Sequence, residues 1–161
     1  MQIHKQGHSY RPVVLITDDD VVMRETLSAY LASFGFDCVT ANDGVSASNK
    51  IESTHYALIL LDLNMPGLQG DLVATAARKS LVNQKTPIAM ITADGERGTL
   101  AKSFQAGATA YLQKPVSRQN IAQLLRTFGF ATETPSQTAA PQQTESDEKG
   151  LWSRLMGSSR R

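Results

Sequence analysis

Five side chains, far apart in the sequence, have types that suit metal-assisted phosphoryl transfer. Asp18 and Asp19 are adjacent, and Asp62, Thr92 and Lys114 follow at wide intervals. Carboxylates that converge repel one another and raise one another's pKa, and a hard divalent cation such as Mg²⁺, which binds oxygen ligands, relieves that repulsion. Phosphoryl transfer also needs a nucleophile and fixed donors for the remaining charge. Brought together, Asp62 is suited to act as nucleophile, Lys114 as cationic clamp and Thr92 as hydroxyl donor.

Short apolar segments run up to these residues. Residues 13–17, 57–61, 88–92 and 110–113 are rich in aliphatic side chains and have the length of buried strands. The chemically suited residues lie at, or directly after, the carboxyl ends of these four segments. In an open α/β sheet, ligands bind outside the carboxyl ends of the parallel strands. The side chains are therefore predicted to meet at one edge of a sheet.

Helical patterns separate the strands. From Val21 to Phe34 apolar residues recur at three- and four-residue steps, and Gly35 follows at the position of a helix C-cap. Asp20 is expected to be an N-cap or a loop residue. Strands alternating with helices predict an α/β fold, a parallel sheet covered by helices on both faces. The further elements expected are a strand over 36–40 and helices over 44–53, 70–81, 97–106 and 117–128.

Composition limits the classes of protein that fit. The 161 residues are 41% hydrophobic and 19% charged with a formal net charge of +1, which favours a folded domain over a strongly basic nucleic-acid binder. The single cysteine, Cys38, excludes an intramolecular disulfide, and three scattered histidines nominate no metal site. The longest apolar run, 56–61, is far shorter than a membrane helix, and the polar start has no signal-peptide pattern. We expect a cytoplasmic protein.

From about Val13 to Phe128 the sequence resembles the receiver domains of two-component response regulators, in particular single-domain receivers of the chemotaxis type. The resemblance covers more than two thirds of the chain. It implies a flavodoxin-like, doubly wound five-stranded parallel sheet with strand order 2-1-3-4-5. The matching elements, in the family's order and spacing, are the pair Asp18-Asp19, the segment Asp62-Leu63-Asn64-Met65-Pro66-Gly67 with Gly70 beyond it, Thr92-Ala93, and Lys114-Pro115 preceded by Tyr111.

The resemblance also implies a covalent phosphoryl adduct and a magnesium site. Asp62 would be the phosphoacceptor, receiving its phosphoryl group from a sensor histidine kinase, a phosphotransfer protein or a small phosphodonor such as acetyl phosphate. Asp19, Asp62 and the backbone carbonyl of Asn64 would bind Mg²⁺, while Asp18 would hold metal-bound water. The family resemblance, and not the spacing alone, carries these roles.

A conformational switch is implied in the same way. Lys114 would contact the phosphoryl oxygens, in a Lys-Pro bond that is usually cis in the family. Thr92 would move toward the new phosphoryl group and Tyr111 would turn inward behind it, remodelling the surface of the fourth helix, fifth strand and fifth helix. A new anion of about −1.5 to −2 charges biases the packing. Asn64 and Asp94 occupy positions that tune the phosphate lifetime in the family.

The chain is expected to divide into an N-terminal arm (1–11), a receiver domain (12–130), a flexible linker (131–149) and a C-terminal tail (150–161). The linker is polar and cannot offset its ordering entropy by burying apolar surface. Because little length remains for a DNA-binding or enzymatic output domain, we expect output through a downstream protein target, or a role as phosphate relay or sink. We expect no direct nucleic-acid binding and no membrane span, and a phosphorylation-dependent homodimer stays open.

The tail holds the chain's one tryptophan. Three interpretations stay open for it: an unstructured end, a short helix that docks into a partner's groove, and weak attachment to an anionic membrane surface through arginines and the tryptophan. The residues that would share one helical face, and so form the partner-docking candidate, are Leu151, Trp152, Leu155 and Met156.

A turnover enzyme is the alternative to a self-phosphorylating receiver. Haloacid-dehalogenase-like phosphatases also use an aspartyl phosphate, Mg²⁺, a threonine and a lysine, and Asp18-Asp19-Asp20-Val21-Val22 fits their D-x-D-x-[TV] motif. They require a further acidic pair in a strand–helix context after the lysine, where only Asp147-Glu148 in the linker remains. They also leave residues 62–67 unexplained. A phosphorylation-independent scaffold is disfavoured because every active-site residue of a receiver is in place.

Overall fold

The described residues fold into alternating strands and helices. The structure is a computed structural model that describes residues 10–93, 95 and 97–132. The predicted tail, and most of the predicted linker and of the predicted N-terminal arm, lie outside the described residues. The elements are β1 (Val13–Thr17), α1 (Val21–Ser33), β2 (Asp37–Ala41), α2 (Gly44–Ser53), β3 (Leu58–Asp62), α3 (Gly70–Lys79), β4 (Ile88–Thr92), α4 (Arg97–Ala106), β5 (Ala110–Gln113) and α5 (Arg118–Thr127).

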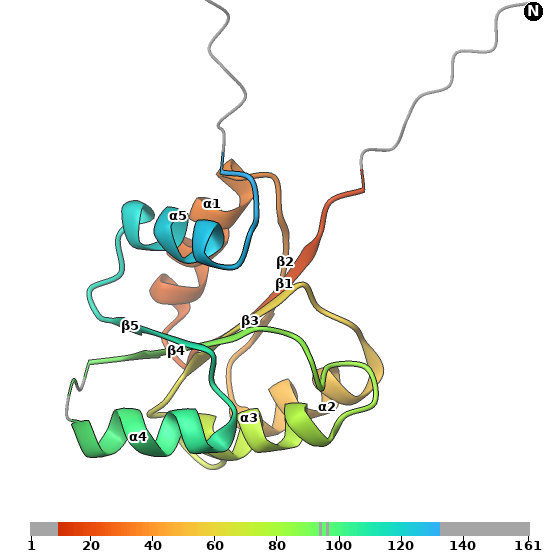
Figure 1. The fold of residues 1–161 in the computed structure, drawn as a ribbon, viewed down its shortest axis with the longest axis vertical. Helices are drawn as coiled ribbons and strands as arrows, with labels where there is room; N and C mark the ends of the chain where they lie inside the picture. Colours follow the sequence, from red (N-terminus) through yellow and green to blue (C-terminus); the bar gives the residue numbers. More distant parts are fainter. Residues whose placement is uncertain (1–9, 94, 96, 133–161) are drawn as a thin grey trace, which may run out of the picture.

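The strands form one parallel sheet in the order β2-β1-β3-β4-β5. Helices α1 and α5 cover one face of the sheet, and α2, α3 and α4 cover the other (Figure 1). This doubly wound, flavodoxin-like arrangement confirms the expected fold class and strand order. The end of the sheet where the strands finish is termed the carboxyl edge, and the opposite end the amino edge.

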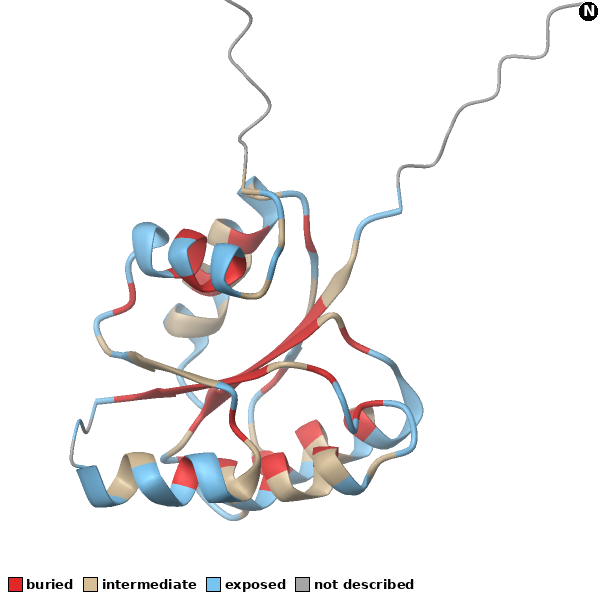
Figure 2. Cartoon of the chain, in the orientation of Figure 1, coloured by how far each residue is buried: buried red, intermediate tan, exposed pale blue. Residues whose placement is uncertain are grey.

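One apolar layer lies on each face of the sheet. Every residue of β3 and β4 is buried, as the red central strands in Figure 2 show. Alternate residues of β1 face different layers: Val14 and Ile16 pack with α1 and α5, while Leu15 packs with α2 and α3. Because both faces of the central strands are removed from water, the sequences of these strands are continuous runs of apolar residues.

Local signals set the ends of α1 as expected. Asp20 is its N-cap, with the carboxylate accepting a hydrogen bond from Val22 N at 2.8 Å, which decides between the two predicted roles of this residue. Beyond the helix, Gly35 has a φ of +89°, the left-handed conformation that glycine adopts without strain. The strands over 88–92 and 110–113 and the helices over 44–53 and 97–106 have the predicted bounds.

Helix α3 is shorter than the sequence pattern predicts. The pattern extends the helix to residue 81, but α3 ends at Lys79 and Ser80 is extended, with φ −69° and ψ 133°. The cause is Asn83, whose buried Nδ2 donates to Ile51 O at 2.6 Å and so fixes the following residues in a loop. Leu81 therefore lies outside the helix and is 91% exposed.

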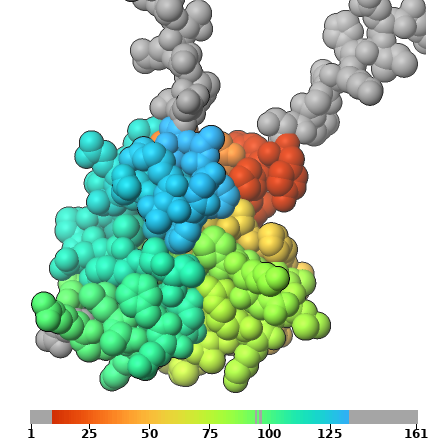
Figure 3. All heavy atoms as spheres, in the orientation of Figure 1, coloured from red at the N-terminus to blue at the C-terminus, as the bar shows by residue number. Residues whose placement is uncertain are grey.

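The first and the last described segments both lie at the amino edge. Phe130 packs edge-on against Phe36, just before β2, with ring centroids 5.2 Å apart. Asp37 N, at the start of β2, donates to Pro12 O at 3.0 Å. In Figure 3 the first described residues, in red, and the last, in blue, accordingly lie on the same side of the molecule. None of the described helices is long and apolar enough to cross a membrane.

Candidate functional site

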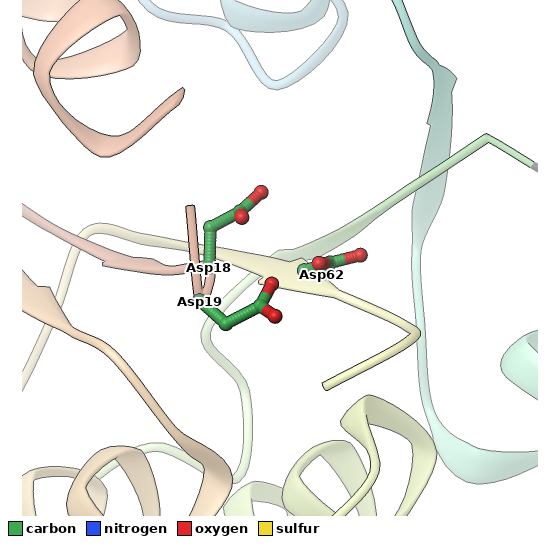
Figure 4. A group of neighbouring side chains, drawn as sticks. All are labelled: Asp18, Asp19 and Asp62. Carbon is green, nitrogen blue, oxygen red and sulfur yellow. The ribbon is translucent and has the colours of Figure 1, made fainter. Parts of the chain in front are cut away.

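Three carboxylates converge at the carboxyl edge. Asp18 and Asp19 follow β1 directly, and Asp62 is the last residue of the neighbouring β3. One carboxylate oxygen from each residue lies within 4.8 Å of the other two, and Figure 4 shows the three side chains gathered beyond the strand ends. Asp18 and Asp62 are only 1% and 3% exposed, whereas Asp19 is exposed. The cluster is therefore open to solvent on the side of Asp19.

Arg24 holds the loop that carries the acidic pair. From α1 its Nη1 donates to the carbonyl of Asp18 at 2.8 Å and to that of Asp19 at 3.2 Å. The Asp18 carboxylate in turn accepts a hydrogen bond from Asp20 N at 2.9 Å. Sequence reasoning did not single out Arg24. The signal that could have found it is an arginine one turn into the helix that follows the acidic pair.

Lys114 supplies the positive charge of the site. Its Nζ lies 3.0 Å from Oδ2 of Asp18 and 3.4 Å from Oδ2 of Asp62. Its backbone N donates to Thr92 O at 2.8 Å, which anchors the residue to the end of β4. The Lys114–Pro115 peptide bond is cis. The lysine thus lies between the two buried carboxylates.

Thr92 and Asn64 form the rest of the site wall. Thr92 ends β4 and is fully buried. Asn64 Nδ2 lies 3.4 Å from Thr92 Oγ1, and Asn64 N lies 3.3 Å from the Asp62 Oδ1 that accepts its hydrogen bond. Asn64 therefore links Asp62 to the buried hydroxyl. This side-chain contact was not predicted, because it depends on how closely two separate strand ends approach.

Gly70 lets α3 start directly against the phosphoacceptor candidate. A Cβ at this position would collide with the backbone carbonyl oxygen of Asp62 and crowd Leu63 Cα. Gly70 N also donates to Leu63 O at 3.2 Å. Any larger residue would have to push the end of β3 away, so Gly70 fixes where Asp62 lies.

Burial and crowding change the protonation of the site. The pKa of Asp62 is raised to about 6, first by burial and then by the Asp18 carboxylate, while Lys114 and the Asn64 amide oppose the rise. Burial lowers the pKa of Lys114, but the two carboxylates outweigh burial and raise that pKa above its ordinary value. The folded protein therefore keeps Lys114 charged and holds the Asp62 carboxylate at a free-energy cost.

The donor set fits a divalent cation. Three carboxylates with one lysine leave an excess of negative charge, and after burial the Asp18 carboxylate is the next cause of the raised pKa of Asp62. Mg²⁺ takes one or two carboxylates and keeps several water ligands. The exposed side of the cluster at Asp19 leaves room for those ligands. A cation there would favour the ionised form of Asp62.

The remaining predicted residues are placed differently. Tyr111 lies on β5, half-buried, and packs against the apolar layer under α2 and α3. Asp94, given a role in phosphate lifetime, lies outside the described residues. The partner-docking candidates Leu151, Trp152, Leu155 and Met156 also lie outside them. The structure thus brings together Asp18, Asp19, Asp62, Asn64, Thr92 and Lys114.

Comparison with known proteins gives one family. The family model of the response regulator receiver domain matches residues 14–126. Among curated proteins, the transcriptional regulatory protein SrrA of Staphylococcus aureus is 36% identical over 125 residues, which are 78% of this chain and 50% of SrrA. The chain therefore spans about half the length of the curated relatives it matches.

Solved structures share the fold. The chemotaxis protein CheY4 of Vibrio cholerae has a TM-score of 0.71 and 28% identity, over 74% of this chain and 99% of that one. The receiver domain of the sensor histidine kinase PA1611 of Pseudomonas aeruginosa has a TM-score of 0.69 and 28% identity, over the same shares of the two chains. That structure has a magnesium ion coordinated in its active-site cleft.

Proposed function

Because the chain belongs to the response regulator receiver domain family, we propose that Asp62 accepts a phosphoryl group from a sensor histidine kinase, a phosphotransfer protein or a small phosphodonor. With a phosphohistidine donor, an oxygen of Asp62 bonds to phosphorus as the bond from phosphorus to the imidazole nitrogen breaks, and that nitrogen takes up a proton from water. The observation that carries this proposal is the buried Asp62 carboxylate with Lys114 Nζ 3.4 Å away.

The proposed magnesium ligands are Asp19, Asp62 and the backbone carbonyl of Asn64, with Asp18 holding metal-bound water. When bound, Mg²⁺ neutralises charge on the transferring phosphoryl oxygens. Lys114 acts as a fixed ammonium donor for the remaining oxygens, since it is already beside Asp62. The cluster of three carboxylates and the magnesium-bearing relative support this assignment.

Phosphorylation adds about −1.5 to −2 charges to a site with a single lysine. The Thr92 hydroxyl is drawn toward this charge, which breaks its 3.4 Å contact with Asn64 Nδ2. Tyr111, half-buried on β5, follows inward. In this proposal the change reaches partner proteins through the surface of α4, β5 and α5, where a phosphorylation-dependent homodimer could also form.

The proposed output is protein–protein contact, without DNA binding by this chain. SrrA is named a transcriptional regulatory protein, but the match covers only half of it, so its output is not carried over. The chain stores or relays one phosphoryl group and does not turn over a substrate. A cytoplasmic location fits this role, because kinases form phosphohistidine from ATP there.

Intact-mass analysis tests the proposal. Purified wild type, Asp62→Asn and Asp18→Asn are incubated with acetyl phosphate, with and without Mg²⁺. We expect a magnesium-dependent single-phosphoryl adduct that Asp62→Asn abolishes. If the wild type does not react with acetyl phosphate, binding of beryllofluoride gives a second readout. An adduct that persists in Asp62→Asn and disappears in Asp18→Asn would replace this proposal with a haloacid-dehalogenase-like phosphatase.

A further inference from the structure

An apolar surface projects into solvent at the amino edge, opposite the carboxylates. The loop between α3 and β4 carries Leu81, 91% exposed, and Val82, 41% exposed. Beside them is a hollow of about 380 Å³ whose lining includes His55, Lys85 and Pro87. Large exposed aliphatic side chains gathered beside a hollow are typical of interaction sites. Leu81, Val82 and this hollow are termed the amino-edge surface.

The loop is built to hold these side chains outward. Asn83 is fully buried, and its Nδ2 donates to Ile51 O at 2.6 Å and to Thr54 O at 2.7 Å. Its Oδ1 accepts hydrogen bonds from Tyr56 N and Thr86 Oγ1, both at 3.0 Å. Because these bonds fix the loop from inside the protein, Leu81, two residues before Asn83, is held where its apolar area stays exposed.

Basic side chains border the amino-edge surface. Lys79 ends α3 and Lys85 lines the hollow, and both are exposed. Within the described part of the chain, neither lysine has an acidic partner within ion-pair distance. The matching occupant has carboxylates next to large apolar side chains.

We propose that the chain's own segment 145–156 docks on the amino-edge surface. In its sequence the acidic residues Glu145, Asp147 and Glu148 precede the apolar pair Leu151 and Trp152, with Lys149 and Gly150 between them. The acidic part faces the two lysines, and the apolar part covers the exposed leucine and enters the hollow. The segment thus supplies both kinds of side chain that the surface requires, in one short run.

The exit point of the chain makes this contact intramolecular. Phe130 packs against Phe36 at the amino edge, and Ile59 N donates to Pro87 O, which places the α3–β4 loop at that same edge. From Thr132 to Glu145 the chain spans up to about 45 Å when extended and about 20 Å as a coil. A domain of this size is about 35 Å across, so the segment reaches the surface.

Tethering allows a small surface to hold the segment. A short flexible linker gives an effective concentration in the millimolar range, so a contact too weak to form between separate molecules is occupied within one. The docked segment leaves the carboxyl edge open, because the amino-edge surface lies at the far end of every strand from Asp62. Phosphorylation and docking are therefore compatible.

Trp152 reports the docked state, because it is the only tryptophan of the protein. We measure its emission and its quenching by acrylamide in the full chain, in wild type, in Leu81→Asp, and in the matched control Leu72→Asp, where an exposed leucine lies on α3 instead. In a two-state docking equilibrium, Leu81→Asp is expected to red-shift the emission and raise the quenching constant about threefold, and Leu72→Asp to leave both unchanged.

The charge part is tested separately. The double variant Lys79→Glu, Lys85→Glu is expected to expose Trp152, and the control Lys50→Glu, Lys102→Glu is not. Circular dichroism checks that each variant is folded. Equal quenching in wild type and Leu81→Asp would overturn the proposal. Protection of Trp152 that rises with protein concentration would also overturn it, because the occupant would then be a second copy.

Discussion

The two edges of the sheet bury polar groups with opposite energetic results. At the amino edge Asn83 is fully buried, and its amide makes four hydrogen bonds of 2.6–3.0 Å. At the carboxyl edge Asp62 is buried to a similar degree, yet its pKa is raised to about 6 by burial and by Asp18. Burial alone therefore does not tell whether a polar group stabilises the fold. The hydrogen-bond and charge partners of the group determine whether it does.

The two edges thus differ in whether their polar side chains support the fold or are suited to bind a ligand. Arg78, near the amino edge, donates its guanidinium hydrogens to the carbonyls of Thr86 and Gly107, both at 2.7 Å, and ties α3 to two neighbouring loops. Lys114, at the carboxyl edge, faces two carboxylates that must also accommodate a cation or a phosphoryl group. Charge left in excess at a buried site is where ligands are expected. Four substitutions test this contrast.

Replacing the satisfied amide is expected to have the largest effect on stability. Asn83→Ala removes four hydrogen bonds and leaves their backbone partners buried, so the free energy of unfolding should fall by about 3–4 kcal/mol. Denaturant unfolding measures the change. The control Asn49→Ala, at an exposed position of α2, should change it by less than about 0.5 kcal/mol. Equal effects at the two positions would break the comparison.

Gly70→Ala is expected to damage the fold and the site together. The added methyl group meets the Asp62 carbonyl, so unfolding free energy should fall by about 2–3 kcal/mol and phosphoryl-adduct formation should slow. Gly98→Ala is the control. A Cβ there meets open space within α4, so it should stabilise the protein by about 0.5–1 kcal/mol. If Gly70→Ala changes neither the free energy of unfolding nor adduct formation, the end of β3 is not held by this contact.

Removing the crowded charge should stabilise the fold. Without metal at pH 7, Asp62→Asn is expected to raise the free energy of unfolding by about 2 kcal/mol, because it removes a buried carboxylate. The pKa of Asp62 is raised from 3.8 to about 6. The wild type therefore keeps the stability of the protonated form below pH 3.8 and loses it as pH rises through about 6.

Thermal unfolding between pH 4 and 8 measures this difference. The advantage of Asp62→Asn should vanish at the acidic end and be complete at the alkaline end. Asp43→Asn is the matched control, since the N-cap of α2 is served equally by either side chain. A stabilisation of Asp62→Asn that does not vary with pH would contradict the charge argument.

The smallest effect is expected at Arg24. Arg24→Ala removes the donor to the carbonyls of Asp18 and Asp19 and loosens the acidic loop, so the affinity for Mg²⁺ should fall about tenfold. Calorimetric titration with Mg²⁺ measures it. Arg118→Ala, which removes a guanidinium stacked on Phe34 at the side of α1, is the control and should leave the affinity unchanged. An unchanged affinity of Arg24→Ala for Mg²⁺ would show that Arg24 does not position the acidic loop for the cation.

Most of the fold could be predicted because its signals are local. Neighbouring residues alone reveal the aliphatic runs of strand length, the N-cap residue Asp20 of α1 and the glycine, Gly35, that follows this helix. The structure has all of these features in place. Leu81 shows the limit. It continues the apolar pattern of α3, but Asn83 ends the helix through contacts with Ile51 and Thr54, far away in the sequence.

The candidate site divides in the same way. The gathering of Asp18, Asp62 and Lys114 at one edge follows from strand ends and could be predicted. The support by Arg24 and the contact of Asn64 with Thr92 could not, because each depends on side-chain geometry between separate segments. The rise in the pKa of Asp62 likewise needs the depth of burial as well as the neighbouring charges.

The strand order also means that the first three strands to be synthesised are neighbours in the sheet. β1 pairs with β2 and with β3, and β4 and β5 add outside that trio. Since chains emerge from the ribosome amino end first, the three earliest strands can pair while the rest is still being made. Asp18, Asp19 and Asp62 all belong to that half, so the three carboxylates of the cluster are synthesised before Lys114, the cation that lies between two of them.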